Sequence, residues 1–459
     1  MTRSNSSTRL ATLLAILLLS ACTSGPSTTS GSSTVTNGSA ATSTTSTTAD
    51  IVGADLILTG KVVTMTEAGE VEALAIDEGH VVAAGDIDTV MGHAGPSTPV
   101  IDLGDNVAYP GFVDAHSHWI GDREHYGVGA PEEAIALALS HGWTSISEHW
   151  VDQQRLDELV ALDRDGSLAV RVDAYLALNL PAPTGEHLGD WYLEYGDGLS
   201  PSDRLRVQGV KVTIDNGWGS QVWWEAGDLL DAFTTAQDAG WQVASHTVST
   251  ESHEMVLDAF EAALDGEPNL LRHRIEHAVQ VTDEQLLRIA DLGLVVVGHT
   301  EGLSTDALGD PEYLEYLGEN LSWLNRYRGF VDAGVKFASA TDTPWMYPDL
   351  QVTPLVGRPQ DLIAGAIDGR GSDGTVAPPS VAAQTLTFDQ ALRSVTIDAA
   401  YAIQADDLRG HLAPGTYGDV TILSSDMAGA MPDAIRDLRV MATIVGGRIL
   451  FCNEQTLCG

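Results

Sequence analysis

Short apolar runs alternate with amphipathic segments along the central part of the chain. The amphipathic segments place apolar residues three and four positions apart, as surface helices do, for example in residues 154–162, 226–239 and 283–292. The apolar runs have the length of buried strands and cover residues 108–116, 144–149, 169–176, 209–214, 242–247, 273–277, 295–299 and 335–341. Alternation of this kind predicts parallel strands joined by right-handed crossovers. Eight such units predict an α/β fold of the (β/α)8 barrel type.

Both ends of the folded region follow another pattern, in which short β-like runs are separated by turn residues. These runs cover residues 55–63, 71–76, 80–85, 419–423 and 440–450. We expect both ends to build one small β-sandwich module from residues 50–106 and 401–459. The barrel would then occupy residues 107–400.

The first 49 residues have the layout of an export signal and a tether. Arg3 and Arg9 precede an apolar run, residues 10–19, that is too short to span a bilayer. The sequence Leu-Ser-Ala-Cys that ends at Cys22 resembles the lipobox of bacterial lipoproteins. We therefore expect residues 1–21 to be a lipoprotein signal peptide and Cys22 to carry the lipid that anchors the exported protein to a membrane of the bacterial cell envelope. An ordinary secretory signal with an incidental cysteine is the alternative.

The segment after this cysteine, residues 22–49, is rich in Ser and Thr and reads as a disordered tether. Of the three cysteines, Cys452 and Cys458 remain, six positions apart. In an oxidising compartment these two would close a small loop as a disulfide. Two free thiols are the alternative.

Composition narrows the class of partner. The chain has 64 acidic and 23 basic residues, a formal net charge of −41, and 44% hydrophobic residues, which is typical of soluble globular proteins. Nucleic-acid binding is excluded, because phosphate contacts need a basic surface. The charge itself says nothing about the fold.

Metal-competent side chains fall where the predicted strands end, which is where barrel enzymes place their active sites. His116 and His118 end the first strand and share a face of it, because side chains alternate along a strand. His246 and His277 end the fifth and sixth strands, and Asp342 follows the eighth. A lone histidine is more often an ordinary polar residue, but five such residues in this order predict a metal centre.

Lys211 lies near the end of the fourth predicted strand, in a chain with only three lysines. A protonated amine beside two divalent cations would be strongly repelled, so a lysine in this place must be neutral or modified. Addition of CO2 to the amine would give a carbamate whose two oxygens can bridge two metal ions. A salt-bridging lysine at the barrel rim is the alternative.

Three motifs, in residues 112–118, 274–278 and 340–344, resemble the amidohydrolase superfamily and within it the YtcJ-like, amidohydrolase-3 branch. The resemblance covers nearly all of residues 50–459. It implies one metal ion on His116, His118 and Asp342, a second on His246 and His277, and carboxylated Lys211 bridging both. The branch often has Ala-Ile-Gly-Asp after the histidine of the fifth strand. This chain has Thr-Val-Ser there, so substrate contacts of that loop do not transfer.

These observations predict a metal-dependent hydrolase that cleaves an amide-like C–N bond of a small molecule. A hydroxide that bridges two divalent ions, expected to be zinc, would attack the carbonyl, and Asp342 would take the proton and return it to the leaving nitrogen. His149 and His299, which each end a strand, are expected to brace ligands or orient substrate. Trp119 and Trp345 follow ligand positions and would line the pocket or pack at the barrel rim.

Two other functions stay open at this point. A mononuclear deaminase of the same superfamily would act on a ring amidine, but such enzymes usually place a catalytic glutamate shortly after the histidine of the fifth strand, and residues 247–249 offer none. A surface-anchored binding lipoprotein would use the barrel without turnover. The substrate and the oligomeric state, for which we consider a homodimer, do not follow from the sequence.

Overall fold

The computed structural model describes residues 53–181, 184–195, 200–215, 221–300, 318–345, 357–371, 374 and 376–458. The expected signal peptide, lipid-bearing Cys22 and tether lie outside these residues. Residues 51–459 form one compact unit. In the part of the chain that is described, no helix combines the length and the apolar character needed to cross a membrane.

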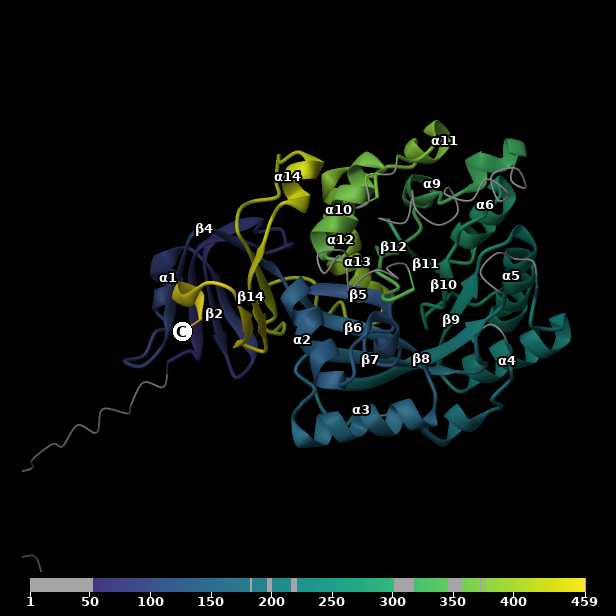
Figure 1. Ribbon diagram of the computed structural model, residues 1–459, viewed down its shortest axis with the longest axis horizontal. Helices are drawn as coiled ribbons and strands as arrows, with labels where there is room; N and C mark the ends of the chain where they lie inside the picture. The colour runs from purple at the N-terminus through teal and green to yellow at the C-terminus, as the bar shows by residue number, and fades with distance from the viewer. Residues whose placement is uncertain are drawn as a thin grey trace, which may run out of the picture. The chain divides into compact units, whose positions relative to one another are not determined.

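A parallel sheet of eight strands, ordered β12-β11-β10-β9-β8-β7-β6-β5, forms the centre of this unit (Figure 1). The strands are β5 (Phe112–Ser117), β6 (Trp143–Val151), β7 (Arg171–Ala177), β8 (Leu205–Thr213), β9 (Gln242–Thr247), β10 (Arg274–His277), β11 (Val295–Gly298) and β12 (Phe337–Ser339). At the carboxyl-terminal ends of β5 and β12, the Asp342 N–H donates to the His116 carbonyl (2.9 Å) and the His118 N–H donates to the Thr343 carbonyl (2.8 Å). These bonds join the first and last strands, and the expected (β/α)8 barrel is confirmed.

The amphipathic segments at residues 154–162, 226–239 and 283–292 are helical as predicted. Helices lie between and after the barrel strands. They are α2 (Pro131–His141), α3 (Gln153–Asp165), α4 (Ala226–Asp238), α5 (Thr250–Leu264), α6 (Asp283–Asp291), α9 (Tyr327–Asp332), α10 (Pro359–Asp368), α11 (Pro379–Ala382), α12 (Phe388–Ser394) and α13 (Ile397–Ala402). Local signals set their ends: the Asp152 carboxylate caps α3, and a capping box of Thr282 and Gln285 begins α6.

The prediction of one strand over residues 108–116 was wrong, because two strands of different sheets meet there. Strand β4 (Val100–Pro110) belongs to a second sheet, and β5 begins only at Phe112. A Cβ at the intervening Gly111 would lie 2.1 Å from Oγ1 of Thr144, so this close approach requires glycine. Both strands are buried at the junction, and the apolar pattern therefore shows no break.

The second sheet contains strands from both ends of the chain. Its order is β15-β14-β13-β4-β1-β2-β3. Besides β4, its strands are β1 (Leu56–Val63), β2 (Glu70–Asp77), β3 (His80–Gly85), β13 (Val420–Leu423), β14 (Val440–Val445) and β15 (Arg448–Cys452). The helices α1 (Ile87–Met91) and α14 (Pro432–Arg436) lie in the connections between these strands. Leu58 and Leu74 share one hydrophobic core with Ile422 and Ile444, so the two chain ends enclose a common core as expected.

The apolar run over residues 440–450 is a hairpin. Its turn is Gly446-Gly447, and both glycines have positive φ (58° and 72°), as a tight hairpin turn requires. Cys452 at the end of the hairpin is joined to Cys458 by a disulfide. The second sheet is tied to the barrel by buried hydrogen bonds, such as that from Thr421 Oγ1 to the Gly142 carbonyl (2.8 Å).

Helix α13 packs against the amino-terminal end of the barrel. Carbonyls at its end accept hydrogen bonds from residues at the starts of three strands: Gln242 Nε2 and Arg274 Nη1 donate to Ala402, and Arg206 Nη2 donates to Ile403. Cationic and amide groups are favourable partners for the last carbonyls of a helix. The predicted metal ligands lie at the opposite, carboxyl-terminal ends of the strands.

Candidate metal centre

The structure brings the six predicted metal ligands to the carboxyl-terminal ends of five barrel strands. They lie in or just after these strands as follows: His116 and His118 (β5), Lys211 (β8), His246 (β9), His277 (β10) and Asp342 (β12). His246 is partly buried, and the other five are buried. The spacing of the apolar runs was therefore sufficient to locate these positions.

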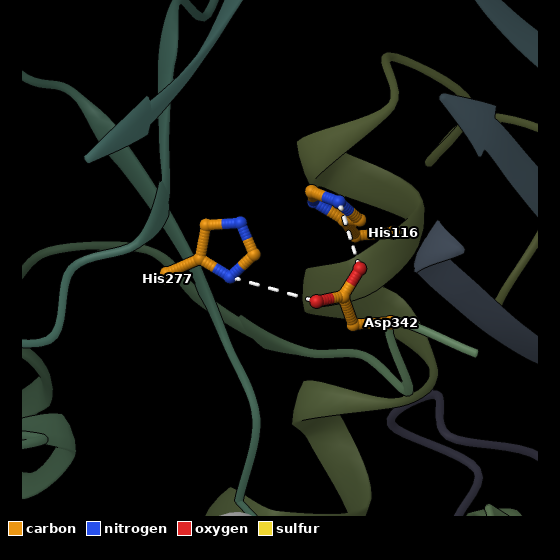
Figure 2. Close-up of side chains that lie close together, drawn as sticks. All are labelled: His116, His277 and Asp342. Atoms are coloured by element: carbon orange, nitrogen blue, oxygen red, sulfur yellow. Dashed lines mark ion pairs between the residues drawn. The ribbon is translucent and has the colours of Figure 1, made fainter. Parts of the chain in front are cut away.

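Asp342 stands at the centre of this cluster. Its Oδ1 lies 3.4 Å from Nε2 of His116 and 3.3 Å from Nε2 of His118. Its Oδ2 lies 3.9 Å from Nδ1 of His277, and Figure 2 shows the carboxylate between the rings of His116 and His277. Ligand atoms of His116, His277 and Asp342 all lie within 4.8 Å of one another, so the carboxylate is close to ligands expected for each of the two ions.

The buried carboxylate of Glu276 orients His116. Glu276 Oε2 lies 2.5 Å from Nδ1 of His116, and the same carboxylate is bonded by Arg274 at 2.5 and 2.9 Å. A carboxylate partner places the ring proton on Nδ1 and leaves the Nε2 lone pair facing Asp342. Glu276 lies within the motif at residues 274–278, directly before a ligand position, but no supporting role was predicted for it.

His299 orients His277 through a chain of two ring contacts. Nδ1 of His299 lies 3.0 Å from the Ala340 carbonyl, which can only accept, so this nitrogen carries the proton. Nε2 of the neutral His299 ring then accepts from Nδ1 of His277 at 2.8 Å. This arrangement leaves the Nε2 lone pair of His277 free for a metal ion.

Asp215, for which the sequence pattern predicted no role, lies beside His246. Its Oδ1 is 3.2 Å from His246 Nε2, and its Oδ2 accepts from the N–H groups of Val248 (3.0 Å) and Ser249 (3.1 Å) and from the Ser252 hydroxyl (2.5 Å). Burial raises the pKa of Asp215, but the hydrogen bonds from His246 and Ser252 outweigh it and hold that pKa below its usual value. The sequence feature that could have identified Asp215 is its position, two residues beyond the end of the fourth barrel strand.

Lys211 is fully buried beneath this cluster. Among the described residues its Nζ has no hydrogen-bond partner, and it lies 5.8 Å from the centre of the Trp150 ring. Burial lowers the pKa of Lys211 to about 8, although the nearby Glu276 and Asp342 carboxylates act in the opposite direction. A salt-bridging rim lysine does not fit this buried position, where Nζ has no hydrogen-bond partner among the described residues.

The donor set fits divalent metal ions. Nε2 of His116, Nε2 of His118 and Nδ1 of His246 are buried without a hydrogen-bond partner in the described part of the chain. Such atoms are costly unless something binds them. Burial holds the pKa values of His116 and His277 well below their usual range, so both rings are neutral, as metal ligation requires.

The backbone at the centre is strained in a way that serves the ligands. Trp150, His277, Ala278 and Asp342 have φ of 53°, 71°, 47° and 51°, in the left-handed region that residues other than glycine seldom adopt. Each such residue costs on the order of 1 kcal/mol or more and is typical of functional sites.

The remaining predicted site residues have different surroundings. His149 is stacked between the rings of His116 (3.9 Å) and Tyr175 (4.4 Å), which braces the metal-ligand candidate. The expectation that Trp119 lines the pocket is not met: its ring is fully buried in the core, and its Nε1 donates to Asp114. Trp345 is 43% exposed at the rim, where its Nε1 donates to Asp122.

Comparison with known proteins places this site in a family. The chain is 28% identical over 389 residues to N-substituted formamide deformylase of Arthrobacter pascens, an alignment that covers 73% of this chain and 68% of that protein. It is 27% identical over 328 residues to Protein LONG AFTER FAR-RED 3 of Arabidopsis thaliana. This alignment covers 66% of this chain but only 51% of the length of that relative.

A solved structure described as an uncharacterized metal-dependent hydrolase from Pyrococcus horikoshii has the same fold. Its TM-score is 0.68 at 19% identity, over 82% of this chain and 99% of that one. The model of the amidohydrolase family matches residues 122–451, which include four of the six predicted ligands. The chain belongs to the amidohydrolase family.

Proposed function

We propose that this protein is a metal-dependent hydrolase that cleaves an amide-like C–N bond of a small molecule. One observation carries the proposal: the carboxylate of Asp342 faces the Nε2 atoms of His116 and His118 at 3.4 and 3.3 Å, and these buried atoms have no hydrogen-bond partner among the described residues. Family membership and the similarity to a formamide deformylase, whose name describes C–N bond cleavage, support it.

The proposed cofactors are two divalent ions, which we take to be zinc because imidazole and carboxylate ligands suit that metal. His116, His118 and Asp342 would hold one ion, and His246 and His277 the other. Lys211, as its carbamate, would lie between them. Bound divalent ions supply two effects here: they lower the pKa of water toward neutrality and polarise the scissile carbonyl.

The side chains of this chain would move the proton. Oδ1 of Asp342 faces the two histidines, so its Oδ2 is the atom free to accept a proton from water and pass it to the leaving nitrogen. Although burial raises the pKa of Asp342, the adjacent ring of His118 outweighs this effect and holds that pKa below its usual value, so the base is ionised at neutral pH.

The test is a hydrolysis screen with metal-reconstituted protein. We would offer N-acyl amines, N-acyl amino acids, cyclic amides and lactones and measure the released amine or acid. Hydrolysis of an amide that requires metal and Asp342 supports the proposal. A single ion per active chain with release of ammonia from a ring amidine would instead favour the mononuclear deaminase. Metal binding without turnover of any class would favour the binding lipoprotein.

We also propose that the chain is exported and anchored through lipid on Cys22. The apolar run at residues 10–19 and the Leu-Ser-Ala-Cys sequence support this location. A disulfide between Cys452 and Cys458 is in keeping with an oxidising compartment.

A further inference from the structure

Two indole rings extend from the candidate metal centre to the protein surface. The ring of Trp150 lies 4.4 Å from the ring of His118, and the ring of Trp345 lies 6.0 Å from that of Trp150, with the planes inclined at 76°. Trp150 is partly buried and Trp345 is 43% exposed. We call these two rings the aromatic wall.

A β-bulge places Trp150 in this wall. The pairing of β6 with β7 is shifted between Glu148 and Val151, and Trp150 has a φ of 53°. Side chains of successive strand residues normally point to opposite faces, but a bulge re-aims one of them. As a result both His149 and Trp150 contact the histidines of the centre, through His116 and His118 respectively.

Hydrogen bonds hold both rings by their polar edges. Trp150 Nε1 donates to Thr213 Oγ1 (2.8 Å), and Trp345 Nε1 donates to Oδ2 of the buried Asp122 (3.1 Å). The same Asp122 oxygen lies 3.4 Å from Nδ1 of His118. The partly exposed ring of Trp345, which also lies 4.6 Å from the ring of His125, is therefore fixed in position relative to a metal-ligand candidate. Fixed aromatic rings beside a reactive centre are typical of substrate sites.

The two arginines beside Asp122 are already paired with protein oxygens, and Lys211, whose Nζ lies 5.8 Å from the centre of the Trp150 ring, would be an anionic carbamate in the proposed site. Arg155 donates to Asp122 at 2.5 Å and to the Trp150 carbonyl at 3.2 Å. Arg123 donates to both oxygens of Glu158 at 2.9 and 3.0 Å. A substrate carboxylate here would have to compete with these carboxylates for its partners, whereas an uncharged apolar group would not.

We propose that the substrate is an uncharged amide bearing a flat apolar group, such as an aryl ring, that packs against Trp345 and Trp150. This inference rests on the proposed hydrolase function and narrows it, because N-acyl amino acids with a free carboxylate become poor substrates. The ring can belong to the acyl part or to the amine part of the amide.

The first experiment compares kcat/KM for three neutral amides and one anionic amide with zinc-reconstituted protein. The neutral amides are N-benzylacetamide, N-methyl-phenylacetamide and N-methylacetamide, and the anionic one is N-acetylphenylalanine. We expect at least one aryl amide to exceed N-methylacetamide tenfold or more and to exceed N-acetylphenylalanine similarly. Equal values for all neutral amides, or a preference for the anionic amide, would overturn the inference while leaving the hydrolase function in place.

Variants of Trp345 separate the ring from its hydrogen bond. Trp345→Phe loses the bond to Asp122 but keeps an aromatic face, and Trp345→Leu loses both. We expect the Leu variant to lose most of the preference for aryl over methyl amides and the Phe variant to keep most of it, with equal zinc content in both. A uniform loss on all amides in both variants would show that Trp345 acts only through Asp122 and would overturn the inference.

A binding measurement tests the wall independently of turnover. The two aryl methanesulfonamides that correspond to the aryl amides resist hydrolysis and can be titrated into wild type, Trp345→Leu and Trp345→Phe by calorimetry. We expect at least one to bind wild type and to bind the Leu variant at least tenfold more weakly. Binding without hydrolysis of any amide would remove the proposed function but keep the wall as an aryl-binding site. Absence of binding to wild type would overturn the inference that the aromatic wall binds an aryl group.

Discussion

The backbone of Asp342 is hydrogen-bonded to His116, and its carboxylate faces the ring of the same histidine. Its N–H donates to the His116 carbonyl at 2.9 Å, and its Oδ1 lies 3.4 Å from the Nε2 of the same histidine. The two residues are 226 positions apart (342 − 116). The contact that closes the barrel therefore also fixes the distance between the proposed base and a metal-ligand candidate.

Replacement of Asp342 by Asn tests the proposed base. The amide retains the shape and the backbone bond but cannot accept a proton, so we expect kcat to fall at least about a hundredfold. Circular dichroism and thermal unfolding should show an unchanged fold, and zinc analysis would separate lost proton transfer from lost metal. Wild-type rates in this variant would remove Asp342 from the mechanism.

Replacement of His299 tests whether it sets the tautomer of His277. His299→Leu removes the acceptor that faces Nδ1 of His277 at 2.8 Å, so we expect zinc affinity to fall about 10- to 100-fold, the range found for such supporting residues. His299→Gln can restore an acceptor oxygen and should recover part of that affinity. The measurement is competition for zinc with a chromophoric chelator. Equal zinc affinities of wild type and the Leu variant would contradict a role of His299 in setting the tautomer of His277.

Reconstitution with and without CO2 tests the carbamate of Lys211. Burial lowers the pKa of this amine to about 8, so a reactive neutral fraction exists at mildly alkaline pH. We expect metal-free protein to take up two zinc ions per chain in bicarbonate buffer and fewer in CO2-free buffer. Lys211→Ala should lose the second ion under both conditions. Identical stoichiometry in all these samples would argue against a bridging carbamate.

The barrel and the ligand positions could be predicted because buried parallel strands leave nearly continuous apolar runs that are interrupted only where they end. His246 and His277 stand at such interruptions, so sequence order alone placed them at one end of the barrel. The boundary at Gly111 could not be found in this way, because strands of two different sheets are buried on both sides of it.

The supporting residues depend on contacts between distant parts of the chain. Glu276 meets His116 across 160 positions, and no local pattern encodes that pairing. Trp119 follows a metal-ligand candidate directly, yet its indole N–H is bonded to Asp114 and its ring enters the core. The direction of a side chain just beyond a strand end is set by such tertiary bonds rather than by the alternation of the strand.

Replacement of Cys22 by Ser tests the proposed anchoring. Cells that express the wild-type protein are grown with radioactive palmitate. We expect the wild-type chain to incorporate the label and to sediment with membranes. The variant lacks the thiol that accepts lipid, so we expect unlabelled protein in the soluble fraction. Labelled or membrane-bound Cys22→Ser protein would contradict lipid attachment at this residue.

The pH dependence of stability can be tested at His273. This residue precedes the start of β10, whereas the metal-ligand candidate His277 lies at the opposite end of that strand. Nδ1 of His273 accepts from the Val243 N–H (3.0 Å), and its Nε2 donates to Gln237 Oε1 (2.6 Å), so the buried ring is neutral. Burial lowers the pKa of His273 from 6.5 to about 4, and a proton therefore binds the unfolded chain more tightly than the folded one.

The stabilising contribution of the neutral ring is complete above pH 6.5 and is lost as the pH falls from 6.5 toward 4. At about 1.4 kcal/mol for each pKa unit, the loss approaches ~3 kcal/mol. His273→Asn keeps an acceptor for the Val243 N–H and does not titrate. We therefore expect the free energy of unfolding, measured by urea denaturation, to fall more steeply between pH 6.5 and 4.5 in wild type than in His273→Asn. If the free energies of unfolding of the two proteins change in parallel over this range, the His273 ring is not held neutral in the folded state.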